Sequence, residues 1–320
     1  MKCPECNYNQ RRGREGMRCR KCRYQFRLDP KNHSSFWKIT DGSFLALLRR
    51  ATGNGTRFIT EDELYTHACG RTLQRGWLTS VIILGSIVLL TFVGMITFRN
   101  PAPVIFFSFS LLILLLMIAN RPFLKRKRWD KIVRTWTSQG GEIPNLIQTP
   151  TLHTPPPEWQ EPDIYDYGFE RLVICEDPLT VDWLVKNGLH TSENALVICE
   201  DGYPEYLLPR AQQALNEAST LPVFLFHGSD TSGTEMETRL RQGGSFPLAR
   251  HPVTDLGIDR ATVHQLRLPR ELRPENITIT PHGLPYVPLM ALLPYAFLHQ
   301  APLVHASVSG ANAEFSTSFG

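Results

Sequence analysis

Residues 171–177 read RLVICED and residues 195–201 read ALVICED, and these two stretches decide the fold that we expect. Each is a short apolar run that ends in two acidic residues. A third apolar run, PVFLF, occupies residues 222–226, and two weaker runs follow near residues 253–256 and 262–266. Amphipathic stretches of helical period separate the runs, a pattern typical of βαβ units. We therefore expect an α/β domain, built on a parallel sheet, over residues 166–305.

Acidic residues follow each of the three strong runs. Glu176 and Asp177 follow the first, Glu200 and Asp201 the second, and Asp230 the third. The carboxyl ends of parallel strands share one edge of a sheet, where ligands bind. The pattern therefore predicts a carboxylate site for Mg²⁺ or Mn²⁺, which prefer oxygen ligands. The alternative interpretation is helix capping, because an Asp before a Pro or a turn is typical of an N-cap.

This part of the chain resembles the Toprim domain of topoisomerase VI A subunits and meiotic double-strand-break proteins. The segments that carry the resemblance are residues 172–176, 202–204, 221–233 and 255–258. The resemblance implies that Glu176 takes the position of an acid–base glutamate and Asp230 that of the second metal-binding aspartate. Gly228 stands where the first aspartate would be, so the resemblance implies a degenerate site, in which Glu200 or Asp201 could replace the lost ligand. The upstream region has no counterpart of the domain with the nucleophilic tyrosine, so we expect no covalent DNA intermediate.

Four cysteines near the N-terminus have the spacing of a metal site. Cys3 and Cys6 form one C-x2-C pair, and Cys19 and Cys22 form another after twelve residues. Two such pairs supply four thiolates to a tetrahedral Zn²⁺ ion. We expect a structural zinc ribbon over residues 1–30, with a rubredoxin-like iron site as the less favoured alternative.

The ribbon is rich in basic residues, interleaved with aromatic side chains. Cations neutralise phosphates and aromatic rings stack on bases, so this composition is compatible with nucleic-acid binding. A small ribbon also needs a polar surface for solubility, so a structural or protein-docking role stays open. The basic residues are Arg11, Arg12, Arg14, Arg18, Arg20, Lys21, Arg23 and Arg27.

Two long runs without charged residues, 77–98 and 101–120, follow the ribbon. The first would extend for roughly 33 Å as a helix, enough for a hydrocarbon core of about 30 Å. We therefore expect two transmembrane helices over residues 76–120, with a buried hairpin of a soluble protein as the alternative. Basic residues flank both runs on the outside, so the positive-inside rule places both ends in the cytoplasm and the protein in the cytoplasmic membrane.

The remaining segments differ in composition and charge. Residues 31–75 should form a small helical segment that includes a capping box at Thr60-Glu61-Asp62-Glu63. Residues 121–165 are basic and then proline-rich, as in a linker, and residues 306–320 should be a flexible tail. Residues 1–75 hold 16 Lys and Arg against 7 Asp and Glu, whereas residues 135–320 hold 10 against 22.

Three functions are compatible with this sequence. The first is a membrane-anchored zinc-ribbon protein whose degenerate Toprim-like domain binds a divalent metal or a phosphate-bearing ligand and associates with nucleic acid. The second is a non-enzymatic membrane scaffold or sensor that docks a protein partner. The third is an active metal-dependent nuclease. The sequence holds no phosphate-binding P-loop and no dinucleotide fingerprint, which excludes the simplest ATPases and dehydrogenases.

Overall fold

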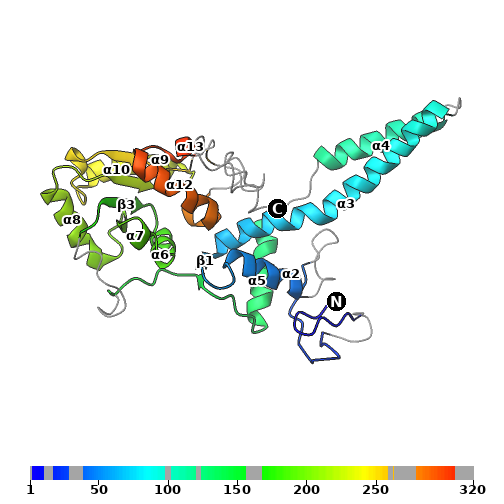
Figure 1. The fold of residues 1–320 in the computed structure, drawn as a ribbon, viewed down its shortest axis with the longest axis horizontal. Coiled ribbons are helices and arrows are strands. Elements are labelled where there is room, and N and C mark those ends of the chain that lie inside the picture. The colour runs from blue at the N-terminus through cyan, green and yellow to red at the C-terminus, as the bar shows by residue number, and fades with distance from the viewer. Residues whose placement is uncertain are drawn as a thin grey trace. The chain divides into compact units, whose positions relative to one another are not determined.

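The computed structural model describes residues 2–10, 17–28, 39–97, 102–119, 124–155, 168–258, 262 and 279–306. The chain divides into two compact units (Figure 1). Unit 1 consists of Met1–Phe44 and Ala68–Gly141, and unit 2 of Leu45–His67 and Glu142–Gly320. The predicted basic residues Arg11, Arg12 and Arg14 lie outside the described residues, as does most of the predicted flexible tail.

Unit 2 contains a parallel four-stranded sheet, as the apolar runs predict. Its strands are β3 (Arg171–Cys175), β4 (Ala195–Cys199), β5 (Val223–Phe226) and β6 (Val253–Asp255). Their order is β4-β3-β5-β6, and every neighbouring pair is parallel. In this register Cys175 lies beside both Cys199 and Phe226. The three strands that precede the acidic residues are therefore adjacent. The weak run predicted near 262–266 lies outside the described residues, except for Thr262.

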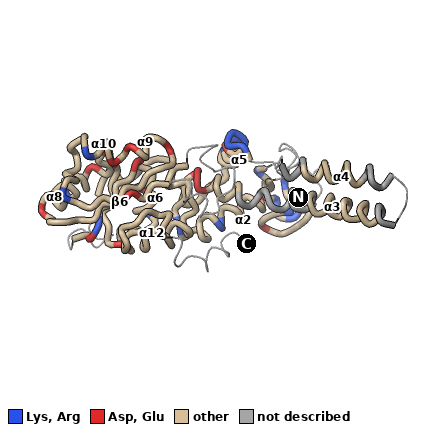
Figure 2. Tube along the Cα trace, turned by 90° about the horizontal axis from the view of Figure 1, so that it is seen from above, with Lys and Arg blue, Asp and Glu red and all other residues tan. Residues whose placement is uncertain are grey.

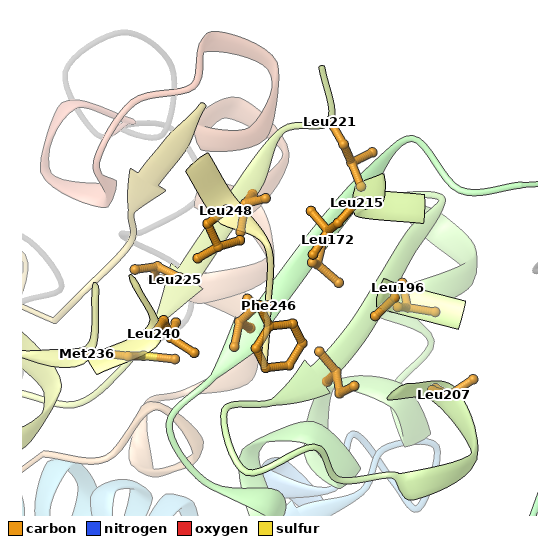
Figure 3. Packing of buried hydrophobic residues seen from close by; sticks show 14 residues of the cluster. Leu172, Leu196, Leu207, Leu215, Leu221, Leu225, Met236, Leu240, Phe246 and Leu248 are labelled. Atoms are coloured by element: carbon orange, nitrogen blue, oxygen red, sulfur yellow. The ribbon is translucent and has the colours of Figure 1, made fainter. Parts of the chain in front are cut away.

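Helices cover both faces of this sheet. Leu172, Leu196 and Leu225 point to one face and pack with side chains of α8 (Leu208–Glu217) and α10 (Met236–Gly243), as Figure 3 shows. On the other face Phe224 contacts Phe297 of α12 (Tyr286–His299), with ring centroids 4.7 Å apart. Strands covered on both faces become continuous apolar runs, which is why the strand sequences do not alternate. Further helices of unit 2 are α6 (Pro178–Lys186), α7 (Leu189–Ser192), α9 (Thr231–Thr234) and α13 (Leu303–Ala306).

The first turn of α3 (Glu61–Thr97) belongs to the same unit. Strand β1 (Ile59–Thr60) leads into it and pairs in parallel with β2 (Leu146–Ile147). The Thr60 hydroxyl accepts a hydrogen bond from the Glu63 N–H at 3.1 Å, which is half of the predicted capping box. The fully buried Glu63 carboxylate instead accepts from the Trp183 indole at 3.0 Å and from the Tyr286 N–H at 2.9 Å. The Glu63 carboxylate is thus bound by two residues that are distant in the sequence, and not by the Thr60 N–H as in a complete capping box.

The prediction of two membrane-spanning helices is wrong for the part of the chain that the structure describes. There, no helix has the length and apolar character needed to cross a membrane. The uncharged runs do form helices, α3 and α4 (Ala102–Ala119). The predicted transmembrane fold class and the predicted location as an integral membrane protein are corrected accordingly.

Unit 1 contains the cysteine-rich segment, the start of α2 (Asp41–Ala51) and α5 (Arg126–Ser138). Phe44 packs between two tryptophans of α5, with ring centroids 5.9 Å from Trp129 and 4.7 Å from Trp136. All three side chains are buried. One face of α5 is therefore held in an aromatic core, and its opposite face is left to solvent.

Candidate metal centre and sheet edge

The two cysteine pairs lie on two turns of the same geometry. The Cys3 N–H donates to the Tyr8 carbonyl at 2.9 Å, and the Cys19 N–H donates to the Tyr24 carbonyl at 2.8 Å. Asn7 and Arg23 occupy the left-handed region at equivalent places, with φ of 58° and 62°. Glycine is the usual residue in this conformation, and asparagine is also tolerated. The chain therefore folds back sharply after each pair and directs both pairs of thiols to one point.

The four sulfur atoms all lie within 4.8 Å of one another. The Sγ atoms of Cys3 and Cys22, and those of Cys6 and Cys19, are 3.5 Å apart, and no disulfide forms. Four sulfurs at about 2.3 Å from a tetrahedral ion would be about 3.8 Å apart, so the cluster has the size of a metal site. The backbone N–H of residue 22 lowers the pKa of the Cys19 thiol to about 7, although burial opposes the shift. At Cys22 a backbone hydrogen bond at residue 24 also lowers the pKa, but burial and the other three thiols outweigh it, and the pKa is raised. A thiolate is the form that binds metal.

Asp41, at the start of α2, holds the end of the cysteine-rich segment. One of its carboxylate oxygens accepts hydrogen bonds from the Tyr24 hydroxyl and the Arg27 N–H, both at 2.8 Å. The other accepts from the Leu28 N–H at 2.8 Å. Asp41 itself is buried, and a buried carboxylate needs such a set of donors.

Arg27 joins the same segment to the end of α5. Its guanidinium donates to the carbonyls of Gln139 at 3.3 Å and Gly140 at 3.2 Å, just after the helix. The guanidinium carbon also lies 4.9 Å from the centre of the Trp136 ring. The cysteine-rich segment and α5 are therefore parts of one packed body.

At the carboxyl edge of the sheet, Glu176 is already engaged by the backbone. Its Oε2 accepts a hydrogen bond from the Gly228 N–H at 2.8 Å. Gly228 has no room for a side chain, because a Cβ there would lie 2.7 Å from the carbonyl oxygen of Ile279. The Ser229 N–H donates to that same carbonyl at 3.0 Å. Residue 279 thus covers the position where the Toprim resemblance places the missing aspartate.

The other predicted carboxylates also have partners of their own. Glu200 forms an ion pair with Arg239, whose Nη2 donates to both carboxylate oxygens, at 2.8 and 3.0 Å. Asp201 accepts from the N–H of Tyr203 at 3.0 Å. Asp177 accepts a hydrogen bond from the Thr180 N–H and caps α6, and Asp230 accepts one from the Gly233 N–H and caps α9, each at 2.9 Å. The capping interpretation is therefore confirmed for these two residues. Within the described part of the chain, the four cysteines form a cluster that is able to hold a metal ion. The carboxylates at the sheet edge do not form another such cluster there.

Two buried histidines near this edge form hydrogen-bond networks with carboxylates. The pattern of acidic residues after the strands does not predict these networks. The first, His227, directs Nδ1 at the Gly228 carbonyl at 2.8 Å and Nε2 at Asp255 Oδ1 at 2.9 Å. Both partners are acceptors, so both ring nitrogens must carry protons. Burial lowers the pKa of His227, but the hydrogen bonds to Asp255 and Gly228 outweigh it and raise the pKa.

The second, His282, lies between two threonine hydroxyls. Thr180 donates to Asp177 at 2.6 Å and Thr280 donates to Asp62 at 3.2 Å, so each hydroxyl proton is already used. The ring nitrogens lie 3.0 and 3.2 Å from these hydroxyl oxygens, and both must therefore donate. Burial lowers the pKa of His282, but Asp177 and Asp62 outweigh it and raise the pKa to about 9. An imidazolium thus joins the starts of α3 and α6.

No protein-family model, no curated protein and no solved structure matches this chain.

Proposed function

We propose that this protein is a zinc-ribbon protein that binds nucleic acid through its basic N-terminal unit, and that its α/β unit is a Toprim-like domain without nuclease activity. The observation that carries the proposal is the four-cysteine cluster, with sulfur separations suited to a tetrahedral ion and exposed basic residues on its second turn. Four thiolates in this arrangement favour Zn²⁺, which has no redox chemistry and takes four sulfurs readily.

The metal would also be needed for the ribbon to fold. Among the described residues of the ribbon, the apolar core around the cysteines contains Phe26 as its one large buried side chain, with Met17 and Tyr24 packed against it. So small a core cannot offset the entropy of ordering the segment. In such ribbons the free energy of metal binding is the free energy of folding. We therefore expect nucleic-acid binding and metal binding to be lost together.

The second cysteine turn supplies the cations. Its basic side chains are exposed, and each can neutralise a phosphate of a nucleic-acid backbone. On the first turn the Tyr8 ring is 40% exposed and offers a surface on which a base can stack. These exposed basic residues of the second turn are Arg18, Arg20, Lys21 and Arg23.

The sheet edge argues against the nuclease alternative. A metal-dependent nuclease needs carboxylates that are free to converge on a cation. Here Glu200 is paired with Arg239, Asp230 caps a helix, and Glu176 accepts a backbone N–H. The Toprim-like domain is then a binding or docking module.

The proposal is tested on the purified full-length protein by metal analysis and by fluorescence anisotropy with labelled single-stranded and duplex oligonucleotides. We expect one zinc per chain, and loss of both zinc and nucleic-acid binding in Cys22→Ser. Cys69→Ala, which removes a buried thiol outside the cluster, should retain both. Zinc-free protein that binds as tightly as the holoprotein would overturn the proposal. So would DNA cleavage in Mn²⁺ that Glu176→Gln abolishes.

A further inference from the structure

Helix α5 has one buried face and one cationic face. Its buried residues are Trp129, Ile132, Val133 and Trp136. Lys127, Lys131 and Arg134 stand at positions i, i+4 and i+7, which share a face of a helix, and all three side chains are exposed. Figure 2 shows the basic residues gathered on α5. Because the aromatic core holds the opposite face, this cationic stripe has a fixed orientation.

The three cations of the stripe are available to a ligand. Among the described residues, none of the three forms an ion pair, whereas the neighbouring Asp130 is bonded to Arg126 at 2.9 Å. The stripe lines an open pocket of about 480 Å³ together with Asp130, Thr135 and Ser138. Like charges held side by side without counterions repel one another, and an anionic ligand would relieve that repulsion.

We propose that the stripe of Lys127, Lys131 and Arg134 binds the phosphate backbone of a nucleic acid, as a second contact surface beside the ribbon. This inference rests on the proposed function and names a part of the site that the cysteine motif does not contain. Along α5 the three residues extend over about 10.5 Å. One strand of a duplex presents a phosphate every 3.4 Å of its axis, so the stripe matches about three phosphates.

A long polyanion fits the stripe better than a single phosphate does. The cations form a row instead of converging on one point, and unit 1 as a whole holds 21 Lys and Arg against 5 Asp and Glu. The Arg27 bonds to the carbonyls of Gln139 and Gly140 join the ribbon to the end of the same helix. The ribbon and the stripe therefore belong to the same packed unit.

The test is the salt dependence of oligonucleotide binding by the full-length zinc-loaded protein. In the variant Lys127→Ala/Lys131→Ala/Arg134→Ala, loss of three phosphate contacts should reduce the slope of log K against log salt by about 2 on a single strand and about 3 on a duplex. Between about 50 and 200 mM salt, the ratio of wild-type to variant affinity should then shrink about 20- to 40-fold. All three side chains are exposed, so zinc content and helical circular dichroism should not change.

Two control variants separate position from charge. Arg49→Ala/Arg241→Ala/Arg250→Ala removes the same charge from exposed positions of unit 2 and should leave the slope unchanged. Lys127→Arg/Lys131→Arg/Arg134→Lys keeps the charges of the stripe and should retain wild-type binding.

Three results would overturn the inference. If the stripe variant binds with the wild-type affinity and slope while Cys22→Ser does not bind, the stripe is not a contact surface and the proposed function stands. If the unit 2 control loses as much slope as the stripe variant, the effect comes from net charge alone. If the wild-type protein binds anionic vesicles and no oligonucleotide, both the stripe and the proposed function are wrong.

Discussion

Replacing His282 by glutamine should remove a pH-dependent part of the stability of the α/β unit. The folded pKa of His282 is about 9, and that of a histidine in an unfolded chain is about 6.5. Each pKa unit corresponds to 1.36 kcal/mol, so the charged ring stabilises the fold by about 3 kcal/mol. Because the folded pKa is the higher one, this contribution is complete below about pH 6.5 and is lost as the pH rises through about 9.

The assay is urea unfolding of the full-length protein and of His282→Gln between about pH 6 and pH 10, read as the difference between their free energies of unfolding. The difference should be largest near pH 6 and should fall by about 3 kcal/mol toward pH 10. The difference is the useful quantity, because the His227 pKa is raised as well and both proteins share its titration. The exposed His305 provides the control variant His305→Gln, which should follow the wild-type curve.

If the free energies of unfolding of the wild-type protein and of His282→Gln differ by the same amount across this pH range, the reasoning is refuted. Such a result would mean that His282 is neutral in the folded protein and that one of the two threonine hydroxyls points away from its carboxylate. The hydrogen-bond directions assigned to Thr180 and Thr280 would then be wrong.

Three further substitutions test other contacts of the α/β unit. Gly257→Ala would place a Cβ on the His227 ring and should lower the free energy of unfolding by about 1–3 kcal/mol in urea titrations; wild-type stability would show that the ring can move aside. Glu200→Gln breaks a partly exposed ion pair with Arg239 and should cost under about 1 kcal/mol, so a larger loss would indicate an undetected role for this carboxylate. Leu225→Ala opens a cavity in the fully packed core and should cost about 2–5 kcal/mol by the same assay, whereas a loss below about 1 kcal/mol would contradict the packing.

Features that depend on neighbouring residues could be predicted from the sequence. The runs that end at Cys175 and Cys199 are strands, because a short continuous apolar run has few other ways to bury itself. The cysteine cluster follows from C-x2-C spacing, since one tight turn places two thiols on the same side. Asp177 caps the next helix because the capping bond closes within three residues.

The uncharged runs show the limit of that reasoning. Composition and length predict a membrane span, and the structure supplies no such helix among the residues that it describes. The capping box at Thr60 shows the same limit on a smaller scale. Its Glu63 carboxylate is taken by Trp183 and Tyr286, which lie 120 and 223 residues further along the chain.

The sequence by itself determined the parallel strands, the cysteine cluster and the capping aspartates, because each depends on contacts that close within a turn or a run. Only the tertiary structure decided which groups meet the strand ends. It placed the Ile279 carbonyl over Gly228, Arg239 against Glu200, and His282 near Asp62 and Asp177. Hydrogen bonds and ion pairs act over a few ångströms in space, whatever the separation of the two residues along the chain. Such contacts therefore cannot be predicted from composition or from the spacing of motifs.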